Sequence, residues 1–95
     1  MLTGKKIVLG VSGGIAAYKM ANVASMLSKL HADIHVVMTE NATHFITPET
    51  FEVLTGNHCY TDTFDRCMEL HVPHIALGTQ ADAILIAPAS ADVVG

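Results

Sequence analysis

The feature that most constrains this chain is a short apolar run followed at once by a glycine-rich turn and a helix-compatible segment. Residues 7–9 are Ile-Val-Leu, residues 10–14 are Gly-Val-Ser-Gly-Gly, and a helical pattern begins near Ile15. Glycine lets the backbone turn tightly and approach an anion closely, and a helix N-terminus offers unpaired N–H groups and a positive dipole end. This order favours a phosphate site, although an ordinary strand-to-helix turn without a ligand has about equal weight.

The spacing within the turn excludes two common nucleotide motifs. The Walker A motif requires a lysine at the start of the helix, and none stands there. In the dinucleotide fingerprint Gly-x-Gly-x-x-Gly, counted from Gly10, Ser12 and Ile15 occupy the places of the second and third glycines. The turn therefore suits the single phosphate of a mononucleotide better than a pyrophosphate, and the Ser12 hydroxyl adds a donor.

Length and composition exclude several classes of protein. The 95 residues make one small domain at most, with five Lys and Arg residues, 5% aromatic residues and a net charge of −4. So few basic and aromatic residues argue against nucleic-acid binding. No apolar run reaches the roughly 18 residues of a membrane span, and the N-terminus has no secretory pattern. We therefore expect a cytoplasmic protein that does not bind a membrane.

The cysteines and histidines do not predict a metal site. Cys59 and Cys67 fit neither a Cys-x-x-Cys zinc pattern nor a disulfide scaffold. His71 and His74 have the spacing of a ligand pair, but no third ligand stands at a suitable distance in the sequence.

Three short apolar runs are predicted to be strands, and the near-continuous apolar character of the first suggests burial on both of its faces. The three runs are residues 6–10, 34–38 and 82–87. Such runs are typical of a parallel sheet covered by helices on both sides, which predicts a three-layer α/β fold. The carboxyl ends of parallel strands meet at one edge of the sheet, where ligands bind. The segments expected to meet at that edge are Gly10 to Ser12, Met38 to Thr39, and Ala87 to Ser90.

Helical patterns join these strands. Residues 15–30 carry an apolar stripe at helical spacing. Thr47 and Pro48 have the pattern of a helix start, and Gly56 ends that short helix after Leu54. The stripe of the first helix consists of Met20, Val23, Ala24, Leu27 and Leu30, and Met26 is a further core candidate.

The remaining segments are less regular. Residues 57–73 show only a short extended piece at 58–60 and a loop at 62–66, in which Asp62 is expected to be solvated. A turn or short helix starts at His74 and ends near Gly78. A three-stranded sheet that ends where a helix should begin predicts the N-terminal part of a longer domain. Thr39 is either a second phosphate or ribityl contact or only the cap of the turn that follows it.

Four segments, taken in order, resemble the motifs of a known family. They are residues 10–19, residues 37–48, residues 74–82 with the pattern His-Ile-x-Leu…Ala-Asp, and residues 87–92 with Ala-Pro-Ala-Ser-Ala-Asp. On these motifs the chain resembles the homo-oligomeric flavin-containing cysteine decarboxylases over essentially its whole length. The likeness is strongest to the phosphopantothenoylcysteine decarboxylase part of the bacterial bifunctional coenzyme A biosynthesis protein.

The resemblance implies a flavodoxin-like (Rossmann-type) α/β fold that binds FMN, with the sheet truncated after the third or fourth strand. It makes residues 1–95 the N-terminal part of an FMN-binding decarboxylase domain. His74 matches the essential histidine of the family. The FMN contacts implied by position are Ser12, Gly13, Gly14 and Ile15 at the phosphate and ribityl end, Thr39 at the phosphate, Phe45 near the flavin, and Pro88, Ala89, Ser90 and Ala91 on its other side.

The implied reaction is decarboxylation of 4′-phosphopantothenoylcysteine to 4′-phosphopantetheine, in which the flavin accepts a hydride and returns it. His74 would act as the base or electrostatic partner near the thiol and carboxylate of the substrate. The family assembles as homotrimers that can form dodecamers. The alternatives are a flavin-binding module without turnover, a peptidyl-cysteine decarboxylase and a flavin prenyltransferase.

Overall fold

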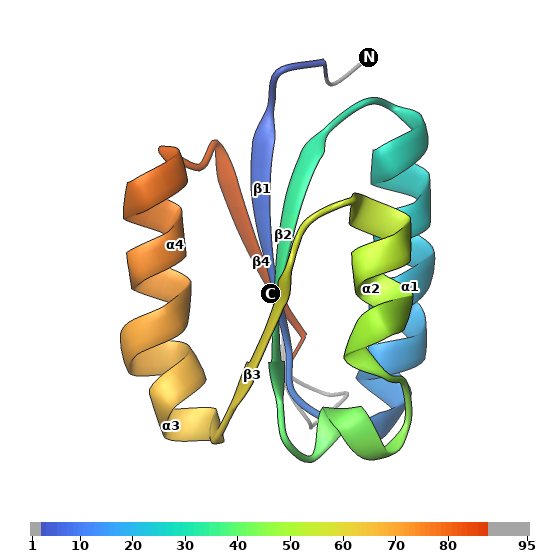
Figure 1. Cartoon of the computed structure of the whole chain (residues 1–95), viewed down its shortest axis with the longest axis vertical. Coiled ribbons are helices and arrows are strands. Elements are labelled where there is room, and N and C mark those ends of the chain that lie inside the picture. The colour runs from blue at the N-terminus through green and yellow to red at the C-terminus, as the bar shows by residue number, and fades with distance from the viewer. Residues whose placement is uncertain (1–2, 88–95) are drawn as a thin grey trace.

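A parallel four-stranded sheet forms the middle layer of the computed structural model, which describes residues 3–87 (Figure 1). The strand order is β3-β2-β1-β4, and every neighbouring pair is parallel. Lys6 pairs with Asp33 at the amino end of the β1–β2 ladder, and Val11 pairs with Met38 at its carboxyl end. The strands are β1 (Lys6–Val11), β2 (Asp33–Thr39), β3 (Cys59–Asp62) and β4 (Ala83–Ala87).

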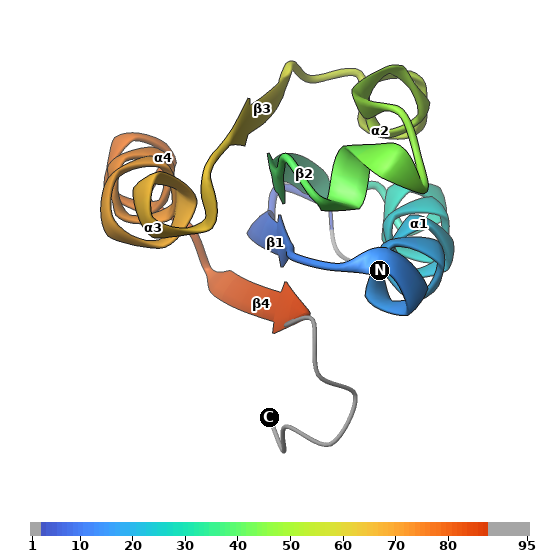
Figure 2. The ribbon, with the colours of Figure 1, turned by 90° about the horizontal axis from the view of Figure 1, so that it is seen from below.

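Helices cover both faces of this sheet, as Figure 2 shows in end view. One face carries α1 (Gly14–Lys29) and α2 (Pro48–Thr55), with the short 3-10 helix η1 (Ala42–His44) between β2 and α2. The other face carries α3 (Phe64–Arg66), the π-helical turn η2 (Cys67–His71) and α4 (Val72–Thr79). The predicted three-layer α/β fold is confirmed.

The alternation of side chains along the strands explains why both faces are buried. Ile7, Leu9 and Val11 of β1 belong to the core beneath α1 and α2, which also contains the buried Phe51 of α2. Val8 of β1 belongs to a second core, formed with β2 and the helical segment after β3. Burying one such Leu, Ile or Phe side chain contributes about 1.5–3 kcal/mol to folding. The members of the second core are Val8, Val37, Cys67, Val72 and Ile75.

The first two helices match their predicted positions. Met20 and Ala24 of α1 are buried, and Val23 and Leu27 are partly buried against the same core. Met26 was a wrong core prediction, because 59% of its side chain is exposed.

The ends of α2 have the predicted residues. Thr47 is the N-cap residue with Pro48 directly after it, and Gly56 ends the helix in the left-handed conformation at φ 75°. That conformation costs glycine nothing, because glycine has no Cβ.

The segment after Gly56 differs most from its prediction. The extended piece near residues 58–60 is the edge strand β3, so residues 82–87 contribute the fourth strand and not the third. In the predicted loop at 62–66, Asp62 ends β3 and Thr63 is a helix N-cap. Residues 64–66 and the predicted turn at His74 belong to one continuous helical segment from Phe64 to Thr79.

The π-helical turn explains why this helix escaped prediction. Cys67 and Val72 are both buried although they are five residues apart, which a π-helical turn allows and a regular α-helix does not. Pro73 also stands inside the segment, where its missing N–H normally indicates a helix boundary. Both features interrupt the 3.6-residue period on which sequence prediction depends.

Candidate functional site

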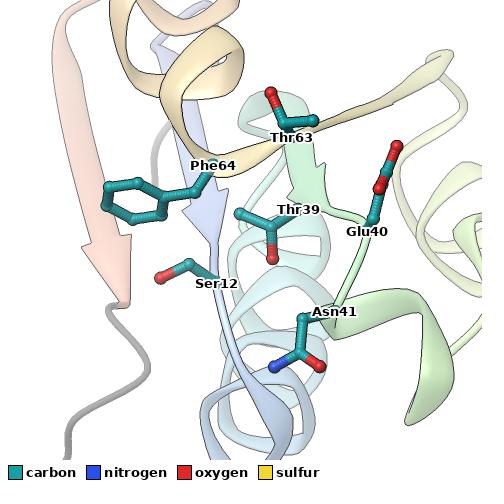
Figure 3. Close-up of a pocket in the computed structure, with 6 residues that line it drawn as sticks. All are labelled: Ser12, Thr39, Glu40, Asn41, Thr63 and Phe64. Atoms are coloured by element: carbon teal, nitrogen blue, oxygen red, sulfur yellow. The ribbon is translucent and has the colours of Figure 1, made fainter.

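A cavity of about 350 Å³ opens where the carboxyl ends of β1 and β2 meet the start of α3 (Figure 3). Its volume lies within the range typical of small-molecule sites. Ser12 directly follows β1 and is only 3% exposed, and Thr39 ends β2 and is only 4% exposed. The lining residues are Ser12, Thr39, Glu40, Asn41, Thr63 and Phe64. The three strand ends that the sequence predicted to meet lie at one edge of the sheet, because Val11 pairs with Met38 on one side and with Ala87 on the other. The rest of the third segment, 88–90, lies outside the described residues.

Thr39 shows the capping role that the sequence left open. Its Oγ1 accepts a hydrogen bond from the backbone N–H of Ala42 at 3.3 Å, which fixes the turn into η1. The same side chain lines the cavity. The cap does not exhaust the hydroxyl, because its own proton can still be donated to a ligand.

Gly13 gives the turn before α1 a conformation that other residues rarely adopt. Its backbone angles are φ 141° and ψ 170°, a region that is essentially restricted to glycine. Gly13 is the N-cap residue of α1 and, as a glycine, makes no side-chain cap hydrogen bond. The first-turn N–H groups and the positive dipole end of this 16-residue helix favour an anion.

The aromatic ring of Phe45 lies directly over Gly14. A Cβ atom on Gly14 would stand 2.7 Å from Phe45 Cζ, which is closer than real side chains approach. Phe45 is 47% exposed, so its ring packs on the helix terminus while one side faces solvent. The predicted residues Gly14 and Phe45 are therefore in contact, although Phe45 does not line the cavity itself.

The carboxylate of Asp62, at the end of β3, has three partners that sequence reasoning missed. Its Oδ1 accepts from the backbone N–H of Thr63 at 2.8 Å, and its Oδ2 accepts from Arg66 Nε at 3.0 Å. His71 Nε2 lies 2.8 Å from the same Oδ2. The hydrogen bond from His71, followed by those from Thr63 and Arg66, lowers the pKa of Asp62 to about 2. The expectation that Asp62 is merely solvated was wrong.

His74 lies away from this cavity. It is exposed on α4, ten residues after Phe64 along one continuous helical segment, which corresponds to about 15 Å at the rise of an α-helix. Two exposed leucines stand on either side of it, Leu70 at 51% and Leu77 at 81% exposure. The catalytic role of His74 stays a prediction.

Neither cysteine is placed as a reactive thiolate. Burial raises the pKa of the Cys59 thiol to about 12. Burial also raises the pKa of Cys67, whose Sγ donates to the backbone carbonyl of Met38 at 3.2 Å. Among residues 3–87, no three His, Cys, Asp or Glu side chains converge as metal ligands. No helix in the described part of the chain is long and apolar enough to cross a membrane.

Four predicted contacts, Pro88, Ala89, Ser90 and Ala91, lie outside the described residues. The roles predicted for the described contacts, Ser12 to Ile15, Thr39 and Phe45, stay predictions as well. Glu40 and Asn41, which follow Thr39, line the cavity but were not predicted as site residues. The same holds for Thr63 and Phe64. They follow a four-residue edge strand with no apolar periodicity, so no pattern in the sequence could place them.

Curated relatives match almost the whole of this chain. It is 46% identical over 93 residues to the coenzyme A biosynthesis bifunctional protein CoaBC of Haemophilus influenzae and to that of Escherichia coli K12. It is 42% identical over 95 residues to CoaBC of Bacillus subtilis. These alignments cover 98–100% of this chain but only 23% of each relative, so the chain spans about a quarter of their length.

Solved structures support the fold. The FMN-dependent cysteine decarboxylase TvaF from thioviridamide biosynthesis superimposes with a TM-score of 0.62 at 20% identity, over 90% of this chain and 52% of TvaF. MrsD from Bacillus sp. HIL-Y85/54728 gives a TM-score of 0.63 at 26% identity, over 90% of this chain and 48% of MrsD. The flavodoxin-like fold and the resemblance drawn from the four motifs are thereby confirmed. Because the flavoprotein family matches residues 1–95, the whole length of the chain, this protein belongs to the flavoprotein family.

Proposed function

We propose that this chain binds FMN with its phosphate at the carboxyl ends of β1 and β2. The observation that carries the proposal is one juxtaposition: the residue directly after the buried Ser12 is Gly13, the N-cap of α1, and Thr39 lies across the same cavity. Backbone N–H groups and hydroxyls donate hydrogen bonds, which phosphate oxygens accept. Membership of the flavoprotein family supports a flavin as the ligand, and the FMN-dependent cysteine decarboxylase TvaF, which shares the fold, supports the choice of FMN.

The residues present fit a flavin mononucleotide. Gly13, the N-cap residue of α1, has no Cβ atom, so an anion can approach the N–H groups of the helix terminus closely. Among the residues lining the cavity, Glu40 carries the only carboxylate, and Figure 3 shows it directed away from Ser12. A single phosphate therefore meets neutral donors and the positive end of the α1 dipole.

We further propose that the chain is the N-terminal part of a decarboxylase domain acting on 4′-phosphopantothenoylcysteine. Its similarity to CoaBC, a protein of coenzyme A biosynthesis, supports this substrate. When bound, FMN supplies reversible hydride transfer, which no amino-acid side chain can provide. In this proposal Ser12 and Thr39 hold the phosphate, Phe45 covers the helix terminus, and His74 holds or accepts a proton at the substrate.

The place of His74 supports a homo-oligomer, proposed here as a trimer or a dodecamer. The imidazole is remote from the Ser12 cavity of its own chain, and exposed Leu70 and Leu77 accompany it on the outer surface of the helix. In an assembly these leucines would be buried, and His74 would face the site of another copy. A cytoplasmic location also stays a prediction.

The test is to titrate the chain with FMN and, separately, with riboflavin, which has the same ring system but no phosphate. Quenching of flavin fluorescence reports binding. We expect FMN to bind at least about tenfold more tightly, because charge-assisted hydrogen bonds to the phosphate contribute roughly 1.5–3 kcal/mol each. Equal affinities for the two flavins would contradict a phosphate site, and no binding of either would contradict the proposed function.

A further inference from the structure

The side chain of Phe64 lines the same cavity as Ser12. Phe64 begins α3, which lies on the face of the sheet opposite α1 (Figure 2). Figure 3 shows the Phe64 ring extending from the start of α3 toward β4, above Ser12 and away from Glu40 and Asn41. The side chain is 53% exposed. When a flat apolar group covers a half-exposed aromatic ring, apolar surface is removed from water and the free energy falls. Its place beside two buried hydroxyls therefore indicates contact with a ligand that has both a polar end and an aromatic ring.

A set of hydrogen bonds around Asp62 fixes the backbone that carries this ring. The carboxylate of Asp62 accepts from the backbone N–H of Thr63, the residue before Phe64, at 2.8 Å. Thr63 Oγ1 in turn accepts from the backbone N–H of Arg66 at 3.4 Å, one turn into the helix. The backbone carbonyl of Asp62 accepts from Glu40 N at 2.9 Å, which joins the start of the helix to the end of β2.

His71 anchors the other side of the Asp62 carboxylate. An ionised carboxylate only accepts hydrogen bonds, so His71 Nε2 is the donor in their 2.8 Å contact. The imidazole stacks on Tyr60 of β3, with ring centroids 5.8 Å apart and an angle of 29° between the planes. Five residues of π-helix, Cys67–His71, place His71 here while Cys67 and Val72 both face the core.

We infer that Phe64 contacts the flavin nucleotide bound in this cavity, and that His71, acting through Asp62, is a positioning residue for Phe64. The inference rests on the proposed function. Phe64 supplies an apolar wall that covers the bound ligand and shields its polar contacts from water. His71 does not contact the ligand. Its hydrogen bond orients the Asp62 carboxylate, which accepts from the backbone N–H of Thr63.

The role of Phe64 is tested by FMN titration of the chain and two variants. Phe64→Ala is expected to bind FMN roughly tenfold more weakly, because about 1.4 kcal/mol of apolar and stacking contact is lost. Phe64→Tyr keeps the ring and is expected to bind within about twofold of the wild type. Tyr18→Ala is the matched control, since Tyr18 is an aromatic residue of similar exposure, 56%, that does not line the cavity.

The role of His71 is tested with His71→Ala, His71→Gln and the double variant Phe64→Ala/His71→Ala. We expect His71→Ala to weaken FMN binding roughly three- to tenfold, and His71→Gln, which keeps an N–H donor, to restore part of the loss. The double variant should bind no more weakly than Phe64→Ala, because His71 acts through that ring. By NMR, the pKa of Asp62 should rise in His71→Ala from about 2 toward its ordinary value of 3.8.

The outcomes separate the inference from the proposed function. If the wild-type chain binds no FMN, both are wrong. If the wild type binds and Phe64→Ala binds equally well, the contact with Phe64 is wrong while the flavin site stands. Additive losses in the double variant, or no partial recovery with His71→Gln, would overturn the positioning role. Thermal melting of every variant identifies any that fails to fold, and His71→Gln then replaces His71→Ala in the double variant.

Discussion

Replacing Gly13 by alanine is expected to lower the free energy of unfolding by about 1–3 kcal/mol and to weaken FMN binding at least tenfold. The backbone of Gly13 has φ 141° and ψ 170°, where the Cβ of any other residue causes strain. Relief of that strain would rotate the peptide that leads into α1 and redirect the N–H groups of its first turn. Chemical denaturation measures the first effect and FMN titration the second.

Gly78→Ala is the matched control for Gly13→Ala, and we expect it to have the opposite sign. Gly78 lies inside α4, and a Cβ there would meet no heavy atom within 4 Å. Alanine in such a helical position is expected to stabilise the chain by about 0.5–1 kcal/mol and to leave FMN binding unchanged. An unchanged denaturation midpoint in Gly13→Ala would show that the turn does not require glycine.

The double variant Ser12→Ala/Thr39→Val is expected to bind FMN about 100-fold more weakly than the wild type, while riboflavin binding changes little. Two hydrogen bonds to a charged phosphate at about 1.5 kcal/mol each give a loss of roughly 3 kcal/mol, or about two powers of ten. The readout is the ratio of the FMN and riboflavin dissociation constants, which reports only contacts with the phosphate.

Thr39→Ser is the control for that variant, because Thr39 also has a structural role. Its hydroxyl caps the turn into η1 through the bond from Ala42 N, and valine removes the cap together with the donor. Serine keeps both and should bind FMN nearly as well as the wild type. An equal loss of affinity for FMN and riboflavin in the double variant would attribute the effect to the fold and not to the phosphate.

Three of the four described strands could be predicted, because each is a continuous apolar run in the sequence. The apolar runs at 6–10, 34–38 and 82–87 correspond to β1 (Lys6–Val11), β2 (Asp33–Thr39) and β4 (Ala83–Ala87). β1 and β2 are largely buried on both faces, as expected for such runs in a parallel sheet. Ile84, Leu85 and Ile86 of β4 are 43–48% exposed, so the apolar run predicts this strand but not its burial.

The third strand and the helix after it could not be predicted in this way. In β3 only Cys59 is buried, and the 64–79 helix contains both a π-helical turn and Pro73. Tertiary packing on Val8 and Val37 stabilises that helix despite its broken period.

The candidate site was predictable to the same degree as its strands. Ser12 and Thr39 meet because they end adjacent parallel strands, and that meeting follows from the fold class alone. Phe64 and Asp62 belong to the segment without a period, so only the three-dimensional structure places them beside the cavity. The position of His74, exposed and remote from Ser12, depends on a helix that continues through residues where the sequence indicates a boundary.

The central claim is that FMN binds at the carboxyl ends of β1 and β2, and chemical-shift mapping tests it most directly. Backbone amide spectra of the labelled chain would be recorded during an FMN titration. We predict that the largest shifts occur at Ser12 to Gly14, at Thr39 to Asn41, and at Thr63 and Phe64. Shifts concentrated at the opposite ends of the strands, around Lys6, Asp33 and Ala83, would contradict the account, as would the absence of any shift at saturating FMN.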